Sequence, residues 1–474
     1  MNRPTLASQP PAPPRPAGRP AEPRVPAPPS PSRPPPATRV LRALAALASA
    51  WWLSMPAGAA PASAAQPASA PVSATAKQVF ERSKGQLLQI RTLLKTQDSQ
   101  ASVGSGFLVD DQGLVITNYH VVSGYALDPD HYRLRYASTD EVEGELTLLA
   151  IDVRHDLALL RADAKLKGRP GLGFRPASQP LLKGDKLFSL GNPHDVAFAV
   201  VEGNYNGLVE RSFDPLIYYA GGINPGMSGG PVLDDEGRVT AINVSLRMFS
   251  QQMSFLVPGE FAQALIKQSG QKALTRPVWP QVRDQLKAYQ QELVDTFLRQ
   301  PWRSANHARY RLPVPQESLF RCWGASSGAE DKGMEYQRTQ CRKDHGVFVN
   351  DGLQVGLLQF SHEVYDGRKL GTLRFSQAYT DSFRNERLGG DGKWQTGAFC
   401  SERSVDQQGL PLRAVVCLRA HKKLEGLYDL NVLVVTRDQA TEGALGRFDA
   451  TGISFDNAKR LTAHYLGGFG WTTR

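Results

Sequence analysis

Cysteine is scarce in this chain, and the few cysteines present exclude the commonest zinc sites. The 474 residues include four cysteines, none of them in a Cys-x-x-Cys pair, which is the spacing that structural zinc sites use. His155 and His194 have no ligand partners at such a spacing, and His362-Glu363 lacks the second histidine of a zinc-protease helix. A Walker-type glycine loop is also missing. We therefore expect no metal site, no cofactor and no P-loop.

Basic clusters are absent as well, although the formal net charge is +10. Seven arginines and one glutamate lie in residues 1–42, so more than half of the net charge belongs to this short segment. The remaining excess is spread along the chain. Because a nucleic-acid partner would require a basic patch, none is expected here.

The apolar run Ala43–Leu53 is too short for a transmembrane helix, which needs about 20 apolar residues. It follows basic residues and precedes a string of alanines, which is the pattern of a secretory signal peptide. We expect residues 40–65 to be such a peptide, cleaved after Ala59 or Ala64, and the protein to be periplasmic or secreted. The alternative is an uncleaved signal anchor, the only case in which a membrane contact is expected.

The tail ahead of that segment is rich in proline. Residues 1–36 hold 15 of the 34 prolines and can bury almost no surface, so residues 1–39 are expected to be disordered. A tail of this kind is unusual before a signal peptide, and the alternative is that the protein truly starts near Val40.

A length of 474 residues suggests two to three domains. Between residues 103 and 257 short apolar runs alternate with glycine, proline and aspartate, which predicts a mostly β domain. Just before it, Lys77–Lys95 has apolar spacings that favour a helix over an entry strand. We expect this first domain to occupy residues 75–270.

A serine stands inside a glycine-rich run at Gly226-Met227-Ser228-Gly229-Gly230-Pro231. Glycines on both sides let the backbone turn tightly and bring two N–H groups close to the serine oxygen. Acyl transfer needs this arrangement, because the nucleophile must lie beside donors that stabilise the developing oxyanion. The nucleophile also needs a base and an acid.

The upstream chain supplies both groups in strand-like settings. His120 follows an apolar run that begins at Gly113, after a glycine break at Asp110–Gly113 that indicates a hairpin. Asp156 stands just before the apolar run Leu-Ala-Leu-Leu. Either residue alone is more often structural, but the order His120, Asp156, Ser228 with these three contexts predicts a catalytic triad.

These motifs resemble the trypsin-fold serine proteases of the bacterial HtrA (Deg) type over about residues 78–270. The resemblance implies two perpendicular six-stranded β-barrels with the triad in the cleft between them. It also implies hydrolysis of peptide bonds through an acyl-enzyme: Ser228 attacks, His120 transfers the proton, and Asp156 orients His120. The backbone N–H groups of Gly226 and Ser228 would form the oxyanion hole.

The chain departs from the family at one position beside the nucleophile. The HtrA type usually has asparagine before the catalytic serine, and this chain has Met227. By resemblance the specificity pocket would be lined by Gly222, Asn243, Val244 and Ser245. No acidic residue marks its base, so a small or medium apolar side chain is the expected preference. Homo-oligomers, of which trimers are typical of the family, are possible.

HtrA-type proteins usually continue into PDZ domains, and none is recognisable here. Instead we expect a smaller α+β, mostly β domain at residues 276–474, opened by a helix that runs to about Arg299 after Pro280. The runs expected to be strands are 346–350, 353–362, 370–378, 414–420 and 430–436, with hairpin turns at 366–367 and 425–426 and a helix at 456–466.

All four cysteines belong to this second region. A signal peptide implies an oxidising compartment, so disulfides are the natural interpretation. Three pairings are possible, and we prefer the local ones, Cys322–Cys341 and Cys400–Cys417. The overall hypothesis is an exported serine endopeptidase acting on proteins or peptides. The alternatives are an inactive protease-fold binding or scaffold protein of the cell envelope and, last, another acyl hydrolase.

Overall fold

The structure is a computed structural model that describes residues 72–244, 253–304, 307, 309–328, 333–384 and 392–472. The predicted proline-rich tail and signal peptide, and Ser245 of the predicted specificity pocket, lie outside the described residues. Within the described ranges no helix is both long and apolar enough to cross a membrane.

Six antiparallel strands close into a first β-barrel in the order β1-β2-β3-β6-β5-β4. Alternate residues of β4 and β5 are buried, as expected when every second side chain points into a barrel. The predicted hairpin joins β2 to β3, and the Asp110 carboxylate accepts hydrogen bonds from Gln112 N and Leu114 N across its turn. The strands are β1 (Leu87–Leu94), β2 (Gln100–Leu108), β3 (Leu114–Asn118), β4 (Tyr132–Ser138), β5 (Glu143–Asp152) and β6 (Leu157–Ala162).

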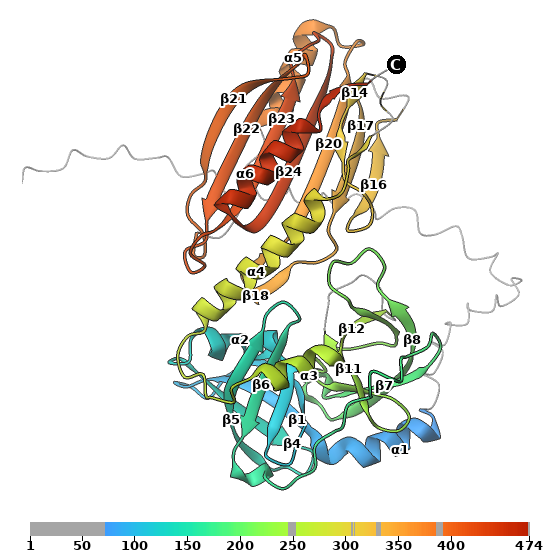
Figure 1. The fold of residues 1–474 in the computed structure, drawn as a ribbon, viewed down its shortest axis with the longest axis vertical. Coiled ribbons are helices and arrows are strands. Elements are labelled where there is room, and N and C mark those ends of the chain that lie inside the picture. Colours follow the sequence, from blue (N-terminus) through green and yellow to red (C-terminus); the bar gives the residue numbers. More distant parts are fainter. Residues whose placement is uncertain are drawn as a thin grey trace, which may run out of the picture. The chain divides into compact units, whose positions relative to one another are not determined.

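A second barrel closes in the order β10-β11-β12-β9-β8-β7. The two six-stranded barrels confirm the expected mostly β, double-barrel fold (Figure 1). The strands are β7 (Lys186–Gly191), β8 (Ala199–Leu208), β9 (Ile217–Ala220), β10 (Pro231–Leu233), β11 (Val239–Val244) and β12 (Ser254–Pro258).

The helix expected over Lys77–Lys95 is wrong in its second half. Helix α1 (Ala74–Ser83) begins where the Ser73 side chain accepts a hydrogen bond from Ala76 N, but the residues from Leu87 onward form β1. They do so because β1 pairs with strands on both sides and completes the barrel. The other short elements here are α2 (Tyr119–Leu127), α3 (Gly259–Gln268) and the 3₁₀ turns η1 (Lys84–Gln86), η2 (Ala164–Leu166) and η3 (Pro193–Asp195).

The second region is built on a seven-stranded antiparallel sheet in the order β16-β17-β20-β24-β23-β22-β21. The long helix expected before it is α4 (Trp279–Leu298), and its predicted apolar face is buried. The sheet strands are β16 (Arg321–Ser326), β17 (Glu335–Arg342), β20 (Leu358–Asp366), β21 (Phe399–Gln407), β22 (Leu410–Ala420), β23 (Leu427–Thr436) and β24 (Glu442–Ser454).

Helices cover both faces of this sheet. On one face α4 and α6 (Phe455–Gly467) share a core with Val432 and Val434, and on the other Phe375 of α5 (Thr372–Arg384) packs on Leu433 (Figure 1). The remaining strands pair in twos: β13 (Arg303–Ser304) with β15 (Pro313–Val314), β14 (Tyr310–Arg311) with β25 (Gly470–Trp471), and β18 (Val347–Asn350) with β19 (Leu353–Val355).

Three expectations for this region are wrong in whole or in part. The run 353–362, expected to be one strand, is divided at Gly356, whose φ of +74° turns the chain, into β19 and the start of β20. The run 370–378, expected to be a strand, lies mostly in helix α5, and Gly367 leads into that helix instead of closing a hairpin. The reason is that Phe375 and Tyr379, four residues apart, both pack on the sheet from one helical face. The turn at 425–426 and the helix at 456–466 are confirmed as the β22–β23 connection and α6.

The four cysteines form two cross-strand pairs. Cys322 and Cys341 face each other on β16 and β17 with an S–S distance of 2.09 Å. Cys400 and Cys417 do the same on β21 and β22 at 2.03 Å. The structure therefore holds the two local pairs preferred from the sequence.

The boundary proposed between residues 270 and 276 falls in the segment between α3 and α4. This segment runs along the first barrel, since Leu274 N donates to Leu148 O and Val278 N donates to Ala126 O. One hydrophobic core continues from the first barrel and α2 into α4 and the seven-stranded sheet. The described residues accordingly pack as a single compact unit.

Candidate active site

His120 lies in the first turn of α2, directly after β3 ends at Asn118. Strand β3 pairs with β6, whose first residue follows Asp156. Asn118 Nδ2 and Tyr119 N both donate to the Asp156 carbonyl, at 2.8 and 3.0 Å. The barrel register therefore fixes the backbone of Asp156 against the start of α2.

The side chains of His120 and Asp156 are in direct contact. His120 Nδ1 lies 2.5 Å from Asp156 Oδ2, and the His120 backbone N–H donates to Asp156 Oδ1 at 2.8 Å. Asp156 has φ +56°, a left-handed conformation that aspartate tolerates better than most residues. With Nδ1–H directed at the carboxylate, the Nε2 lone pair is free to accept a proton.

The pKa of His120 reflects two opposing influences. Burial lowers it, but the negative charge and hydrogen bond of Asp156, together with the charge of Asp351, raise the pKa above its ordinary value of 6.5. These carboxylates thus favour the imidazolium form, which a general base must adopt after accepting a proton.

Ser228 follows a tight turn at Asn224–Met227, closed by a hydrogen bond of 3.1 Å from Met227 N to Asn224 O. Pro225 and Gly226 occupy its centre, and Gly226 has φ +95°, as a type II turn requires. A Cβ at Gly226 would lie 2.4 Å from Asn192 O, so only glycine fits.

The same turn orients two backbone donors. His194 N donates to Pro225 O at 2.8 Å, and because C=O and N–H of a trans peptide point in opposite directions, the Gly226 N–H points away from His194. In the part of the chain that the structure describes, the N–H groups of Gly226 and Ser228 have no acceptor. Two donors beside the serine are therefore available.

Close glycine contacts set the Ser228 loop against the segment that carries His120. A Cβ at Gly229 would lie 2.8 Å from Asn118 N, and one at Gly104 would meet both Val121 Cγ2 at 2.5 Å and Ser228 O at 3.0 Å. Ser105 N also donates to Ser228 O at 2.7 Å. The structure thus brings His120 and Asp156 together and places Ser228 on the adjoining loop. Among the described residues no hydrogen bond joins the Ser228 hydroxyl to the imidazole.

Met227 fits the loop in place of the family's asparagine. Its side chain is fully buried, and its carbonyl accepts hydrogen bonds from Gly230 N and Asn243 Nδ2 at 3.0 and 3.2 Å.

Ser105, which sequence reasoning missed, also braces this loop, because its hydroxyl donates to Gly226 O and accepts from Asn192 N. Its position between two glycines inside a strand was the available signal.

The residues expected to line a specificity pocket differ from one another in burial and in hydrogen bonding. Asn243 is buried, its Oδ1 accepts from Ser189 Oγ at 2.7 Å, and its Nδ2 donates to Leu190 O at 2.9 Å. Its side chain therefore joins strands of the second barrel. Val244 is buried and Gly222 is half-buried at the edge of the loop, and the pocket itself stays a prediction.

Helix α4 lies outside the barrels, and its side chains bond to the segment just before Asp156. Gln285 accepts a hydrogen bond from Val153 N and donates one to Ile151 O, both at 2.8 Å. Arg154 bridges the buried Asp214 of the second barrel at 2.8 Å and Glu292 of α4 at 2.6 Å. No sequence motif indicated this contribution from beyond the barrels.

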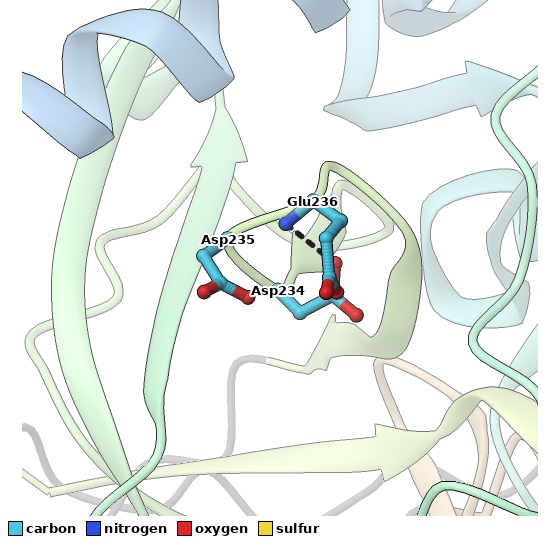
Figure 2. Close-up of side chains that lie close together, drawn as sticks. All are labelled: Asp234, Asp235 and Glu236. Carbon is cyan, nitrogen blue, oxygen red and sulfur yellow. Dashed lines mark hydrogen bonds between the residues drawn. The ribbon is translucent and has the colours of Figure 1, made fainter.

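An acidic cluster lies elsewhere, in the turn between β10 and β11 (Figure 2). Asp234, Asp235 and Glu236 each offer a carboxylate oxygen within 4.8 Å of the others. The buried Asp234 is already paired with Arg175 and Arg238 and accepts from Glu236 N at 3.2 Å. These contacts account for the cluster as a braced turn.

Comparison with known proteins finds similarities within the two barrels. Residues 104–242, which include His120, Asp156 and Ser228, match the trypsin-like peptidase domain. Protease Do-like 1 of Arabidopsis thaliana chloroplasts is 34% identical over 189 residues, covering 37% of this chain and 41% of that protein. A probable periplasmic serine endoprotease, DegP-like, of Ectopseudomonas mendocina is 33% identical over 193 residues, covering 39% and 38%.

Among solved structures, the serine endoprotease from Yersinia pestis aligns with a TM-score of 0.36 and 22% identity, covering 42% of this chain and 66% of that one. The chain spans about two fifths of the length of the two curated relatives it matches. The matches to those relatives leave more than half of this chain uncovered.

Proposed function

We propose that this chain, whose barrels form a trypsin-like peptidase domain of the HtrA (Deg) type, is a serine endopeptidase that hydrolyses peptide bonds in proteins through an acyl-enzyme. One observation carries the proposal. The His120–Asp156 pair adjoins a serine loop whose two backbone N–H groups have no acceptor among the described residues.

In the proposed mechanism Ser228 Oγ attacks the scissile carbonyl carbon while His120 Nε2 takes its proton. Asp156 holds the imidazole and stabilises its cation, and the oxyanion accepts hydrogen bonds from Gly226 N and Ser228 N. His120 then protonates the leaving amine. In the second half of the reaction His120 takes a proton from water, which attacks the acyl carbon, and returns that proton to Ser228 Oγ as the acyl group leaves.

We also propose that the protein is exported. The charged, apolar and small-residue pattern of residues 40–65 supports this, as do relatives named as periplasmic endoproteases and cysteines paired at bonding distance. N-terminal sequencing of the native protein should find a mature end between about residues 60 and 66. An end within the first 40 residues would contradict cleavage.

Hydrolysis of an unfolded protein such as casein tests the proposed activity. The purified chain should release acid-soluble peptides, and Ser228→Ala and His120→Ala should each reduce the rate by several orders of magnitude. Circular dichroism should show that both variants remain folded. Equal proteolysis by the wild type and the Ser228→Ala variant would overturn the proposal, as would a folded wild type without activity, which the binding-protein alternative predicts.

A further inference from the structure

A hairpin from the C-terminal region lies against the start of helix α2, where His120 is found. It consists of β18 and β19, with its tip at Asn350–Gly352. The buried Tyr119 hydroxyl donates to Val349 O at 3.0 Å, although the two residues are separated by 230 positions in the sequence. The residue before the proposed catalytic histidine is thus hydrogen-bonded to a segment that follows the barrels in the sequence.

Phe348 directs its ring at the histidine itself. Val347 and Val349 are buried in the shared core, so Phe348 between them points from the opposite face of the strand and is only half-buried. Its ring lies 6.0 Å from the His120 ring at 75°, and 6.3 Å from the Tyr119 ring at 69°. Both are edge-to-face contacts, so the ring stands beside the imidazole and does not cover it flat.

Asp351 adds a carboxylate at the tip of the same hairpin. Its side chain is exposed, and within the described residues it forms no ion pair with a basic side chain. It lies near enough to His120 for its charge to favour the imidazolium. An exposed, unpaired anion beside a proposed catalytic histidine is available to a basic group of a bound peptide.

The hairpin is firmly held. Gly356 N donates to Thr451 O at 2.8 Å, and a Cβ at Gly356 would lie 2.6 Å from the Tyr289 ring of α4. At the tip, a Cβ at Gly352 would lie 2.7 Å from Trp394 Nε1. The backbone of the hairpin and of the residue after it thus packs closely against α4 and the segment before β21, and these contacts hold the hairpin in place.

From this geometry we propose that the β18–β19 hairpin forms a wall of the substrate-binding cleft. Phe348 packs on an apolar side chain of the substrate next to the scissile bond, and Asp351 pairs with a lysine or arginine of the same peptide. The reason is spatial: His120 must reach the leaving amine, so residues flanking the scissile bond pass beside the groups that surround the imidazole. The C-terminal region therefore selects substrates. This inference rests on the proposed peptidase function.

The test compares cleavage of a positional peptide library by the full chain and by hairpin variants. Wild type should prefer a basic residue at one subsite, and Asp351→Lys should replace that preference with an acidic one, a change of at least tenfold in the ratio of kcat/KM values. Phe348→Ala should raise KM for peptides with a large apolar residue at the neighbouring subsite and leave kcat within about twofold, as loss of uniform binding does. Asp235→Lys makes the same charge change at an exposed turn and serves as the matched control.

Labelling with a small fluorophosphonate separates this inference from the proposed function, because such a probe reports the triad and has no peptide to place on the hairpin. Labelling in all variants with an unchanged library profile would overturn the hairpin's role and leave the peptidase intact. A uniform increase in cleavage of every peptide by Phe348→Ala would also overturn it, since the hairpin would then obstruct the cleft. Absence of labelling in the folded wild type would instead count against the peptidase.

Discussion

Asp156 is the most constrained side chain of the site, because it accepts hydrogen bonds from both the ring and the backbone of His120. Its backbone is in turn fixed by Asn118 and Tyr119. This arrangement sets which imidazole nitrogen carries the proton, and under the proposed mechanism Asp156 acts on the rate through His120 without touching the substrate.

Replacing Asp156 by asparagine should therefore abolish most of the activity without unfolding the chain. Asparagine keeps the size of the side chain but removes the charge and presents the wrong hydrogen-bonding pattern to Nδ1, so kcat should fall by about 10⁴-fold. Steady-state kinetics measure the loss, and an unchanged circular dichroism spectrum is the control. A loss of less than tenfold would remove Asp156 from the proposed triad.

Asp351 should influence the pH profile in a defined direction. Its charge contributes to raising the pKa of His120, and the base must be neutral to act, so activity is lost as the pH falls through that pKa. In Asp351→Asn the pKa should be lower, and the acidic limb of kcat/KM against pH should move to lower pH. Asp235→Asn should leave the limb in place. A shift to higher pH would contradict the contact between the hairpin and the histidine.

At the scale of elements, the site depends on a helix outside the barrels. The amide of Gln285 in α4 satisfies a backbone donor and a backbone acceptor in the loop before Asp156. Unsatisfied groups of this kind cost about 1–3 kcal/mol each. The loop is also held by Arg154, whose guanidinium lies over the rings of Phe213 and Tyr289 at 5.3 and 5.4 Å.

Gln285→Ala should release this loop, lowering stability by about 2–6 kcal/mol because two backbone groups lose their partner, and slowing labelling of Ser228 as Asp156 becomes less well placed. Urea unfolding and the rate of fluorophosphonate labelling measure the two effects. The exposed Gln281 of the same helix provides the control, because its side chain makes no hydrogen bond to any of the described residues. Equal behaviour of the two variants would show that α4 does not brace the loop.

The elements differ in how far they could be predicted. The β2–β3 hairpin and α4 carry their signals locally, in a glycine break and in apolar spacings of one helical face, and both were predicted. The apolar residues of segment 370–378 are compatible with the period of a strand and with that of a helix. It forms a helix because Phe375 and Tyr379 then both pack on the sheet. The sequence predicts the strands of the hairpin beside His120, within 346–350 and 353–362, but it carries no local signal for the contact with Tyr119, which lies 230 positions away from Val349.

Across the whole molecule, one hydrophobic core joins the first barrel to the seven-stranded sheet. The buried Asp214 of the second barrel adds a polar link, since it contacts Arg154 and accepts from the Tyr289 hydroxyl at 3.2 Å. A chain held in this way is expected to unfold cooperatively.

Two probes should therefore report a single unfolding transition. No tryptophan lies between Trp52 and Trp279, so tryptophan fluorescence follows the C-terminal region while labelling of Ser228 follows the barrels. Their urea midpoints should coincide. Separate midpoints would show that the two regions unfold independently, in conflict with a shared core.

The cross-strand cysteine pairs should add stability to the same transition. A variant with both Cys322→Ser and Cys341→Ser should lose about 3 kcal/mol in oxidising buffer, as expected for closure of a loop of this length. Wild type treated with a reductant should lose more stability than the variant, because the reductant also opens the Cys400–Cys417 pair. Identical urea midpoints with and without reductant would contradict a contribution from the disulfides, and non-reducing peptide mapping identifies the pairs directly.

The measurement that tests the central claim most directly is mass-spectrometric mapping of a fluorophosphonate adduct on the purified full chain. The account predicts one adduct, on Ser228, that disappears in His120→Ala while the chain remains folded. A folded wild type without an adduct, or an adduct on another serine that persists in His120→Ala, would contradict the assignment of His120, Asp156 and Ser228 as the catalytic triad.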